Sequence, residues 1–134
     1  MQVQPYLHFN GRCDEAIQFY KKALGAEVNM LMRFKDCPDK NAPIKPEVFD
    51  KVMHANLNIG GNTLLISDGQ CQGTARFDGF SLTLNVKNDS DAKRLFDALQ
   101  DGGKIVMPLG KTFFSSSFGM VNDRFGVSWM VIVQ

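Results

Sequence analysis

The sequence lacks several features that mark particular protein classes. Lysine and arginine number 15 against 14 aspartates and glutamates, so no surplus of positive charge exists to attract nucleic acid or an anionic membrane. No apolar run approaches the roughly 20 residues of a membrane span, and no signal-peptide pattern is present. The cysteines Cys13, Cys37 and Cys71 are widely spaced and form no CxxC pair. We therefore expect free thiols in a cytoplasmic protein with no nucleic-acid or membrane partner.

Large apolar side chains, by contrast, are abundant. Eleven phenylalanines and seven methionines stand among 134 residues, a length that allows a sizeable core in one domain or in two small fused halves. This composition indicates a core or a cavity lined by large, adaptable apolar groups.

Residues 52–68 give the clearest local prediction, a β-hairpin that turns at Gly60-Gly61. Side chains alternate across a strand, so one face of this hairpin is nearly pure core material. The opposite face is a mixed polar surface: His54, Asn56, Asn58, Thr63, Leu65 and Ser67. Because it holds one of only two histidines, we expect function on this second face.

The element order of the first half is repeated in the second. Strand, helix, strand, strand and strand are predicted over 3–9, 13–24, 27–34, 52–59 and 62–68. The same order is predicted over 80–87, 91–100, 104–107, 120–122 and 127–133. Pro108 is expected to end its strand, residues 35–51 form a loop or lid, and 113–118 stay unassigned.

Short internal matches support a duplication. Glu15-Ala16 aligns with Asp91-Ala92, and the segment 61–66 aligns with 126–131. The predicted fold is therefore α+β, one domain over 1–134 built from two tandem βαβββ modules at about 1–70 and 78–134.

Motifs spread over the chain resemble those of a known family. They include Glu15-Ala-Ile-x-Phe-Tyr20, His54-Ala-x-Leu-x-Ile-Gly-Gly61 and Phe118-Gly-Met-Val-x-Asp-x-Phe-Gly-Val-x-Trp129. As a set they resemble the PhnB-like proteins of the glyoxalase/bleomycin-resistance/extradiol-dioxygenase (vicinal oxygen chelate) superfamily. The resemblance implies curved mixed sheets around a cleft, and a homodimer. Such proteins often carry a 3-demethylubiquinone methyltransferase label, but no glycine-rich loop that could hold S-adenosylmethionine follows a strand here, so we expect no cofactor.

Metal enzymes of this superfamily carry four ligands at equivalent strand positions. The resemblance places those positions at Pro5, Leu65, Ser81 and Met130. Proline and leucine cannot ligate a metal, and methionine and serine are poor ligands for hard or borderline divalent ions. We therefore expect no metal at the usual site.

The remaining cleft residues combine apolar walls with neutral hydrogen-bonding groups, which is typical of a small-molecule pocket. The expected ligand-binding residues are Phe9, His54, Asn56, Leu65, Ser67, Ser81, Thr83, Phe114, Phe118 and Met130. Phe113, Phe114 and Phe118 form either a mobile flap or part of the core. Alternation turns His8 away from Leu7 and Phe9, toward the helix side.

His54 is the candidate catalytic residue, because imidazole exchanges protons near neutral pH. It is either a general base or ligand contact, or a polar strand residue satisfied by its neighbours. Asp68 and Asp123 are expected to form turns. The leading hypothesis is a metal-free protein that sequesters or transforms a small organic ligand. The alternatives are an enzyme that uses His54 as acid or base, with or without a metal held elsewhere, and an interaction subunit with a vestigial cleft.

Overall fold

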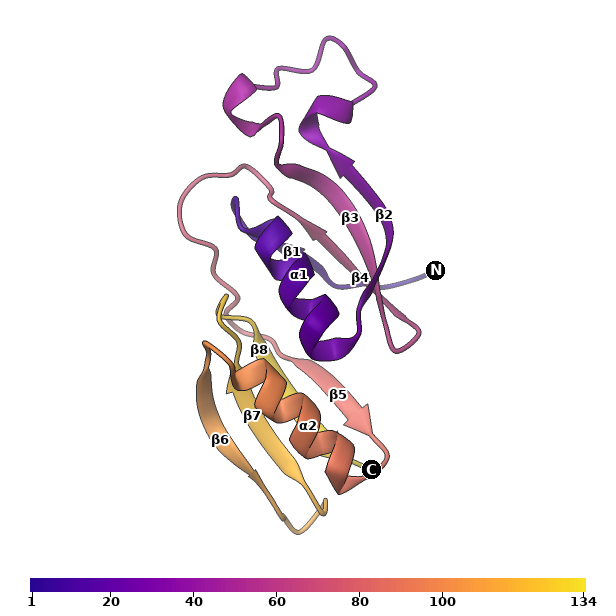
Figure 1. Cartoon of the computed structure of the whole chain (residues 1–134), viewed down its shortest axis with the longest axis vertical. Helices are drawn as coiled ribbons and strands as arrows, with labels where there is room; N and C mark the ends of the chain where they lie inside the picture. Colours follow the sequence, from indigo (N-terminus) through magenta and orange to yellow (C-terminus); the bar gives the residue numbers. More distant parts are fainter. The chain divides into compact units, whose positions relative to one another are not determined.

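The computed structural model describes all 134 residues, and its internal contacts divide them into unit 1, residues 1–75, and unit 2, residues 76–134 (Figure 1). The elements of unit 1 are β1 (Tyr6–His8), α1 (Cys13–Leu24), β2 (Glu27–Arg33), η1 (Phe34–Asp36), η2 (Pro46–Val48), β3 (Val52–Ile59) and β4 (Asn62–Ser67). Those of unit 2 are β5 (Leu82–Val86), α2 (Asp89–Gln100), β6 (Lys104–Gly110), β7 (Phe118–Asn122) and β8 (Ser128–Val133). Apart from the two short 3₁₀ helices, both units follow the predicted βαβββ order.

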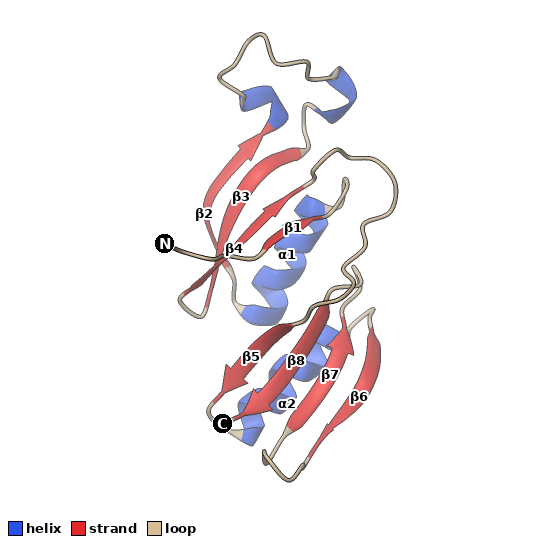
Figure 2. Cartoon of the chain, turned by 180° about the vertical axis from the view of Figure 1, so that it is seen from behind, coloured by secondary structure: helices blue, strands red, loops and turns tan.

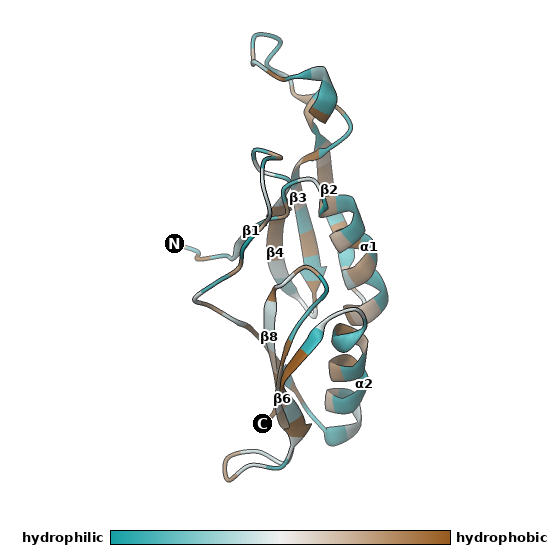
Figure 3. Cartoon of the chain, turned by 90° about the vertical axis from the view of Figure 1, so that its left-hand side faces the viewer, coloured by the Kyte–Doolittle hydropathy of each residue, from teal (hydrophilic) through white to brown (hydrophobic).

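The two units have the same sheet topology (Figure 2). The strand order is β1-β4-β3-β2 in unit 1 and β5-β8-β7-β6 in unit 2. In each sheet the first strand pairs in parallel with the last, and the other pairings are antiparallel. Figure 3 shows that each helix covers one side of its own sheet only. The predicted α+β class with two mixed sheets is confirmed.

Both helices form where their apolar stripes predict them. α1 buries six residues against its sheet and ends at Gly25, whose φ of 66° is the left-handed conformation that glycine adopts without strain. α2 begins at Asp89, two residues before the predicted start. Its first turn is capped by Asn88, whose side-chain oxygen accepts a hydrogen bond from the Asp91 backbone N–H at 2.7 Å.

The predicted hairpin is confirmed together with its register. Ile59 pairs with Asn62 and Asn56 with Leu65, and the turn residues Gly60 and Gly61 have φ of 58° and 86°. The face toward α1 is fully apolar and buried: Ala55, Leu57, Leu64 and Ile66. This face, with α1, forms the core of unit 1.

Two strand predictions were wrong, and both involve a proline. The first strand covers Tyr6–His8 rather than 3–9, because Pro5 has no N–H to donate to the ladder. Pro108 does not end its strand but lies inside β6, which is the edge strand of its sheet. On an edge strand the side without a partner needs no N–H donor, so proline is tolerated there.

Candidate functional site

The side of the unit 1 sheet that faces away from α1 is the candidate site, and we call it the open face of unit 1. Register and burial place on it Tyr6, His8, Met30, Met32, His54, Asn56, Asn58, Thr63, Leu65 and Ser67. One row across the sheet runs Met30, Asn56, Leu65 and Tyr6. The polar residues of the hairpin therefore lie together as predicted, and two residues of β1 join them.

The predicted faces of β1 were reversed. Leu7 pairs with Ile66, which packs toward α1, so Leu7 and Phe9 point into the core. Phe9 is 1% exposed and its ring packs on that of Tyr20, so the expectation that Phe9 lies beside His54 was wrong. His8 was expected on the helix side and instead lies exposed on the open face. A strand of three residues carries too little alternation to fix its own orientation.

His54 is held by a residue that sequence reasoning missed. The Tyr6 hydroxyl oxygen lies 2.7 Å from His54 Nδ1. The Tyr6 ring also stacks on the His8 ring, with centroids 4.9 Å apart and an interplanar angle of 18°. Burial raises the pKa of Tyr6, and a hydrogen bond with the Ser67 side chain offsets part of this rise. His54 is half-exposed, and its Nε2 makes no hydrogen bond within the protein.

Two other predicted residues of this face differ in what they can offer a ligand. Ser67 is 3% exposed, and its hydroxyl donates to the Met53 carbonyl at 2.7 Å and accepts from the Gly69 N–H at 2.8 Å. Its role in the structure is therefore to join β4 to β3. Asn56 is half-buried, and its Oδ1 is buried without any hydrogen-bond partner. An unpaired buried acceptor costs free energy, so Asn56 is the unsatisfied polar group of this face.

Asp68 lies beneath the open face and closes the turn before α1. It is fully buried, and its carboxylate accepts backbone N–H bonds from Gly11 at 2.7 Å, Cys13 at 2.8 Å and Val52 at 2.9 Å. The predicted structural role of Asp68 is confirmed. Because its carboxylate already occupies the N-terminus of α1, this end of the helix does not offer those donors to another anion.

The corresponding open face of unit 2 is dominated by methionine and phenylalanine. Register aligns Met107, Met120, Met130 and Thr83 in one row across the four strands. Ser81 lies at its border, with its hydroxyl oxygen 2.7 Å from that of Ser128. Met130, Thr83 and Ser81 thus share one region of unit 2, as predicted.

Three phenylalanines form an aromatic ladder beside this row. The Phe113 and Phe114 ring centroids lie 5.0 Å apart, and those of Phe114 and Phe118 lie 5.1 Å apart. Phe113 is fully exposed and Phe114 half-exposed, whereas Phe118 is partly buried at the start of β7. Phe113 and Phe114 are therefore surface residues, and the alternative that places them in the core is wrong.

The residues do not fit the divalent metal of the superfamily. No group of three or more His, Cys, Asp and Glu side chains anywhere in residues 1–134 could hold a metal ion. Of the four equivalent positions, Pro5 and Leu65 are joined by a backbone hydrogen bond, in which the Leu65 N–H donates to the Pro5 carbonyl at 3.1 Å. The donor set there lacks carboxylate and imidazole ligands, so it does not suit such a metal.

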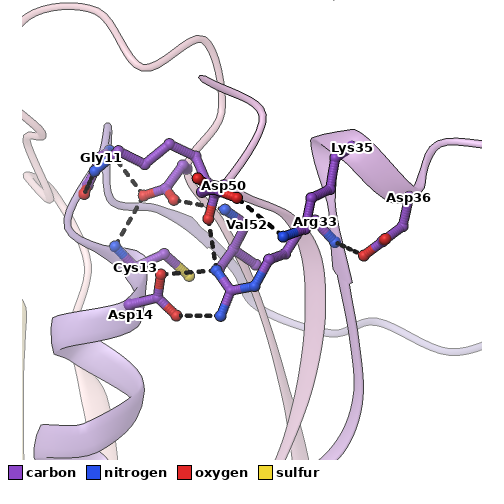
Figure 4. A network of polar contacts seen from close by, with 10 residues as sticks. Gly11, Cys13, Asp14, Arg33, Lys35, Asp36, Asp50 and Val52 are labelled. Carbon is purple, nitrogen blue, oxygen red and sulfur yellow. Dashed lines mark hydrogen bonds and ion pairs between the residues drawn. The ribbon is translucent and has the colours of Figure 1, made fainter. Parts of the chain in front are cut away.

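A charged cluster that the sequence did not reveal holds the base of the 34–51 segment (Figure 4). The Arg33 guanidinium donates to both carboxylate oxygens of Asp14 at 2.9 Å, and to the Asp50 carbonyl at 2.6 Å. Lys35 Nζ lies 3.0 Å from the Asp50 carboxylate. Both ends of the segment are thereby tied to one another and to α1. Nothing in the sequence spacing links Arg33 to Asp14.

The chain is similar to known proteins over nearly its whole length. Residues 1–132 match the family described as 3-demethylubiquinone-9 3-methyltransferase. Protein YjdN of Escherichia coli (strain K12) is 38% identical over 140 residues, covering 99% of this chain and 95% of YjdN. The crystal structure of PA1353 from Pseudomonas aeruginosa is 42% identical with a TM-score of 0.87, over 100% of this chain and 98% of PA1353. A PhnB protein from Bacillus cereus is 28% identical with a TM-score of 0.81, over the full length of both.

A more distant likeness concerns the fold alone. A glyoxalase-related enzyme from Fulvimarina pelagi has a TM-score of 0.66 at 17% identity, over 100% of this chain and 88% of that enzyme. The predicted glyoxalase-like architecture is thus confirmed at the level of the fold.

Proposed function

We propose that a small organic molecule binds to this chain, which belongs to the PhnB-like family described as 3-demethylubiquinone-9 3-methyltransferase, within the vicinal oxygen chelate superfamily. The observation that carries the proposal is the Tyr6–His54 contact on the open face of unit 1. It fixes a half-exposed imidazole among apolar and amide side chains, with one ring nitrogen free of protein partners. Apolar walls with a few oriented polar groups are what small-molecule sites use.

The binding residues of unit 1 are, in this proposal, Tyr6, His54, Asn56 and Leu65. Phe9 and Ser67 are left out because both are buried. Unit 2 presents a candidate surface of its own, whose thioether, aromatic and hydroxyl groups suit an organic ligand: Ser81, Thr83, Phe114, Phe118 and Met130. We propose that the protein sequesters this ligand or transforms it.

The second candidate function is catalysis with His54 as acid or base. The same contact favours it, since a second group that orients an imidazole is a common arrangement for proton transfer. Loss of turnover with retained binding in His54→Gln would favour the enzyme. Equal loss of both would favour a binding protein.

A methyltransferase activity has no comparable support. The turn between β1 and α1 contains a single glycine, Gly11, and its N–H is bonded to Asp68. We therefore expect S-adenosylmethionine to leave the melting temperature unchanged. An upward shift that grows with its concentration would show that this expectation is wrong.

We further propose a cytoplasmic homodimer. The edge strand β6 exposes Ile105, Val106 and Met107, which supports pairing with a second copy. All three cysteines are free thiols, as expected for a reducing compartment. No helix is long and apolar enough to cross a membrane. Light scattering at micromolar concentration should give twice the mass of the chain, and a monomer would contradict the dimer.

The proposed function is tested by metal analysis combined with a thermal-shift screen of small organic compounds. We expect no stoichiometric metal, and compounds whose stabilisation disappears in His54→Ala. Thr63→Ala is the matched control, because Thr63 lies on the same face but forms no hydrogen bond through its side chain. Stoichiometric zinc, nickel, iron or manganese would contradict the metal-free proposal, and stabilisation that persists in His54→Ala would remove His54 from the site.

A further inference from the structure

We infer that Tyr6 is a positioning residue that keeps the proton of neutral His54 on Nε2. The site then presents a hydrogen-bond donor, and it takes a ligand with an acceptor oxygen, such as that of a carboxylate or a carbonyl. The inference rests on the proposed function for its ligand, but the state of His54 is a property of the protein alone. It is therefore testable without any ligand.

The Tyr6 hydroxyl oxygen and His54 Nδ1 are 2.7 Å apart, which is hydrogen-bond distance. A neutral imidazole has one donor and one acceptor nitrogen, and a phenol has one proton to donate. The Tyr6 hydroxyl has two side-chain hydrogen-bond partners, His54 Nδ1 and Ser67, and we assign its proton to the 2.7 Å contact with Nδ1. With Tyr6 donating, Nδ1 is the acceptor and the imidazole proton lies on Nε2, the nitrogen without a protein partner.

The Tyr6 ring is itself held in place. It stacks on His8 at 4.9 Å, and His8 in turn lies against the backbone of Gly69. A Cβ built on Gly69, whose φ is 58°, would come within 3.1 Å of His8 Nδ1, so glycine leaves the room that the His8 ring needs. The support for His54 therefore runs from Gly69 through His8 to Tyr6.

The surroundings of His54 favour an acceptor ligand. Met32 pairs with His54 across the ladder, and the neighbouring row contributes Met30 and Leu65, all without charge. The acid that register places on this face is Glu27, opposite Asn58 near the hairpin turn. Asp68 is buried and fully engaged by backbone N–H groups. The region around His54 thus combines a donor nitrogen, the Asn56 amide and apolar walls, and register places no carboxylate directly beside His54.

Nuclear magnetic resonance of the ring nitrogens tests the tautomer directly. The chain has two histidines, so ¹⁵N-labelled protein gives two rings, and His8→Gln assigns them. At about pH 8, above the usual imidazole pKa, we expect His54 to carry its proton on Nε2 with Nδ1 hydrogen-bonded. In Tyr6→Phe, which retains the aromatic stack, the Nδ1 signal should move toward that of a ring without this bond. Tyr6 is 41% exposed, so this variant should fold.

A proton on Nδ1 in the wild-type protein would overturn the inference, because Tyr6 would then be the acceptor and Nε2 a base. An unchanged His54 spectrum in Tyr6→Phe would also overturn it. Thr63→Ala, on the same face, should leave both rings unaffected.

The ligand class is tested with two probes of similar shape, benzoate and benzylammonium. Benzoate should shift the His54 ring signals, and Tyr6→Phe should weaken its binding roughly three- to tenfold, the range of one hydrogen bond. Benzylammonium should leave these signals unchanged. If benzylammonium binds and benzoate does not, the ligand is not of the hydrogen-bond-acceptor class, while the proposed function survives. If neither probe binds at His54, the acceptor class is refuted as well. If no compound in the thermal-shift screen stabilises the protein but the proton is observed on Nε2, the proposed function is refuted and the assignment of the His54 tautomer still holds.

Discussion

The open faces of units 1 and 2 lie on sheets of the same strand order but carry different side chains. In unit 1 the row across the sheet that ends at Tyr6, the partner of His54, contains Asn56. The central row of unit 2 contains Met107, Met120 and Met130 instead. The sides that face the helices, by contrast, are apolar in both units. The duplicated fold thus retains its core pattern, while the outward residues differ in chemistry. The two histidines of the chain, His8 and His54, both lie on the open face of unit 1.

Buried carboxylates are a second point of comparison, and here the units are alike. Asp123 of unit 2 accepts hydrogen bonds from the Phe125 and Val127 N–H groups at 2.9 and 3.0 Å and from Trp129 Nε1 at 2.9 Å. Asp68 accepts three backbone N–H bonds in unit 1. Each unit therefore has one buried carboxylate that satisfies donors from a turn and its neighbours.

The largest expected effect comes from removing these carboxylates. Asp68→Ala and Asp123→Ala should each lower the free energy of unfolding by about 3–5 kcal/mol, because three donors, buried or partly buried, lose their acceptor. Urea denaturation measures both variants. A loss of less than about 1 kcal/mol in one of them would break the proposed equivalence of the two turns.

The next effect separates the two open faces by ligand binding. For a compound found in the thermal-shift screen, His54→Gln should weaken affinity about tenfold, since one hydrogen bond to the ligand is lost. Met130→Leu should change affinity less than about threefold, because a volume-conserving apolar exchange retains the contact surface. Isothermal titration calorimetry measures both. A larger loss in Met130→Leu would assign the main binding surface to unit 2.

The sequence predicted the elements with strong periodicity and missed contacts that depend on tertiary structure. The hairpin register followed from Gly60-Gly61 and the alternation around it, and the helix stripes gave both helices. The three residues of β1 carry no such pattern, so the faces of His8 and Phe9 were reversed. The contact of Tyr6 with His54 joins residues 48 apart in the chain, and it exists only because β1 pairs with β4.

A smaller effect compares the ion pairs of the two units. Arg33→Ala should lower the free energy of unfolding by about 0.5–1 kcal/mol, because the half-buried Arg33 side chain is engaged by Asp14 and the Asp50 carbonyl. Lys93→Ala, which removes the exposed pair with Asp97 on α2, should cost about 0.3–0.5 kcal/mol. Denaturation at low and high salt checks both, and the Arg33 effect should shrink as salt increases. A larger effect for Lys93 would contradict the role given to Arg33.

The smallest effect concerns acid sensitivity at two exposed carboxylates. The hydrogen bond from Lys35 lowers the pKa of Asp50 in unit 1, and hydroxyl hydrogen bonds, that of Ser116 foremost, lower the pKa of Asp89 in unit 2. A lowered folded-state pKa stabilises the protein at neutral pH, and this contribution is lost as the pH falls below about 4. Carboxyl ¹³C titration should show Asp50 returning toward its ordinary pKa in Lys35→Met, with Asp89 unchanged. A simultaneous change at Asp89 would show that the substitution acts beyond its own contact.

The central claim is that binding chemistry lies on the open face of unit 1, at the His54 held by Tyr6. The most direct measurement is a ¹H–¹⁵N chemical-shift map of the protein with the most strongly stabilising compound of the screen. We predict that the largest changes fall on the backbone and ring signals of Tyr6, His54 and Asn56. Changes confined to the methionine row and the phenylalanine ladder of unit 2, with His54 unaffected, would contradict the claim.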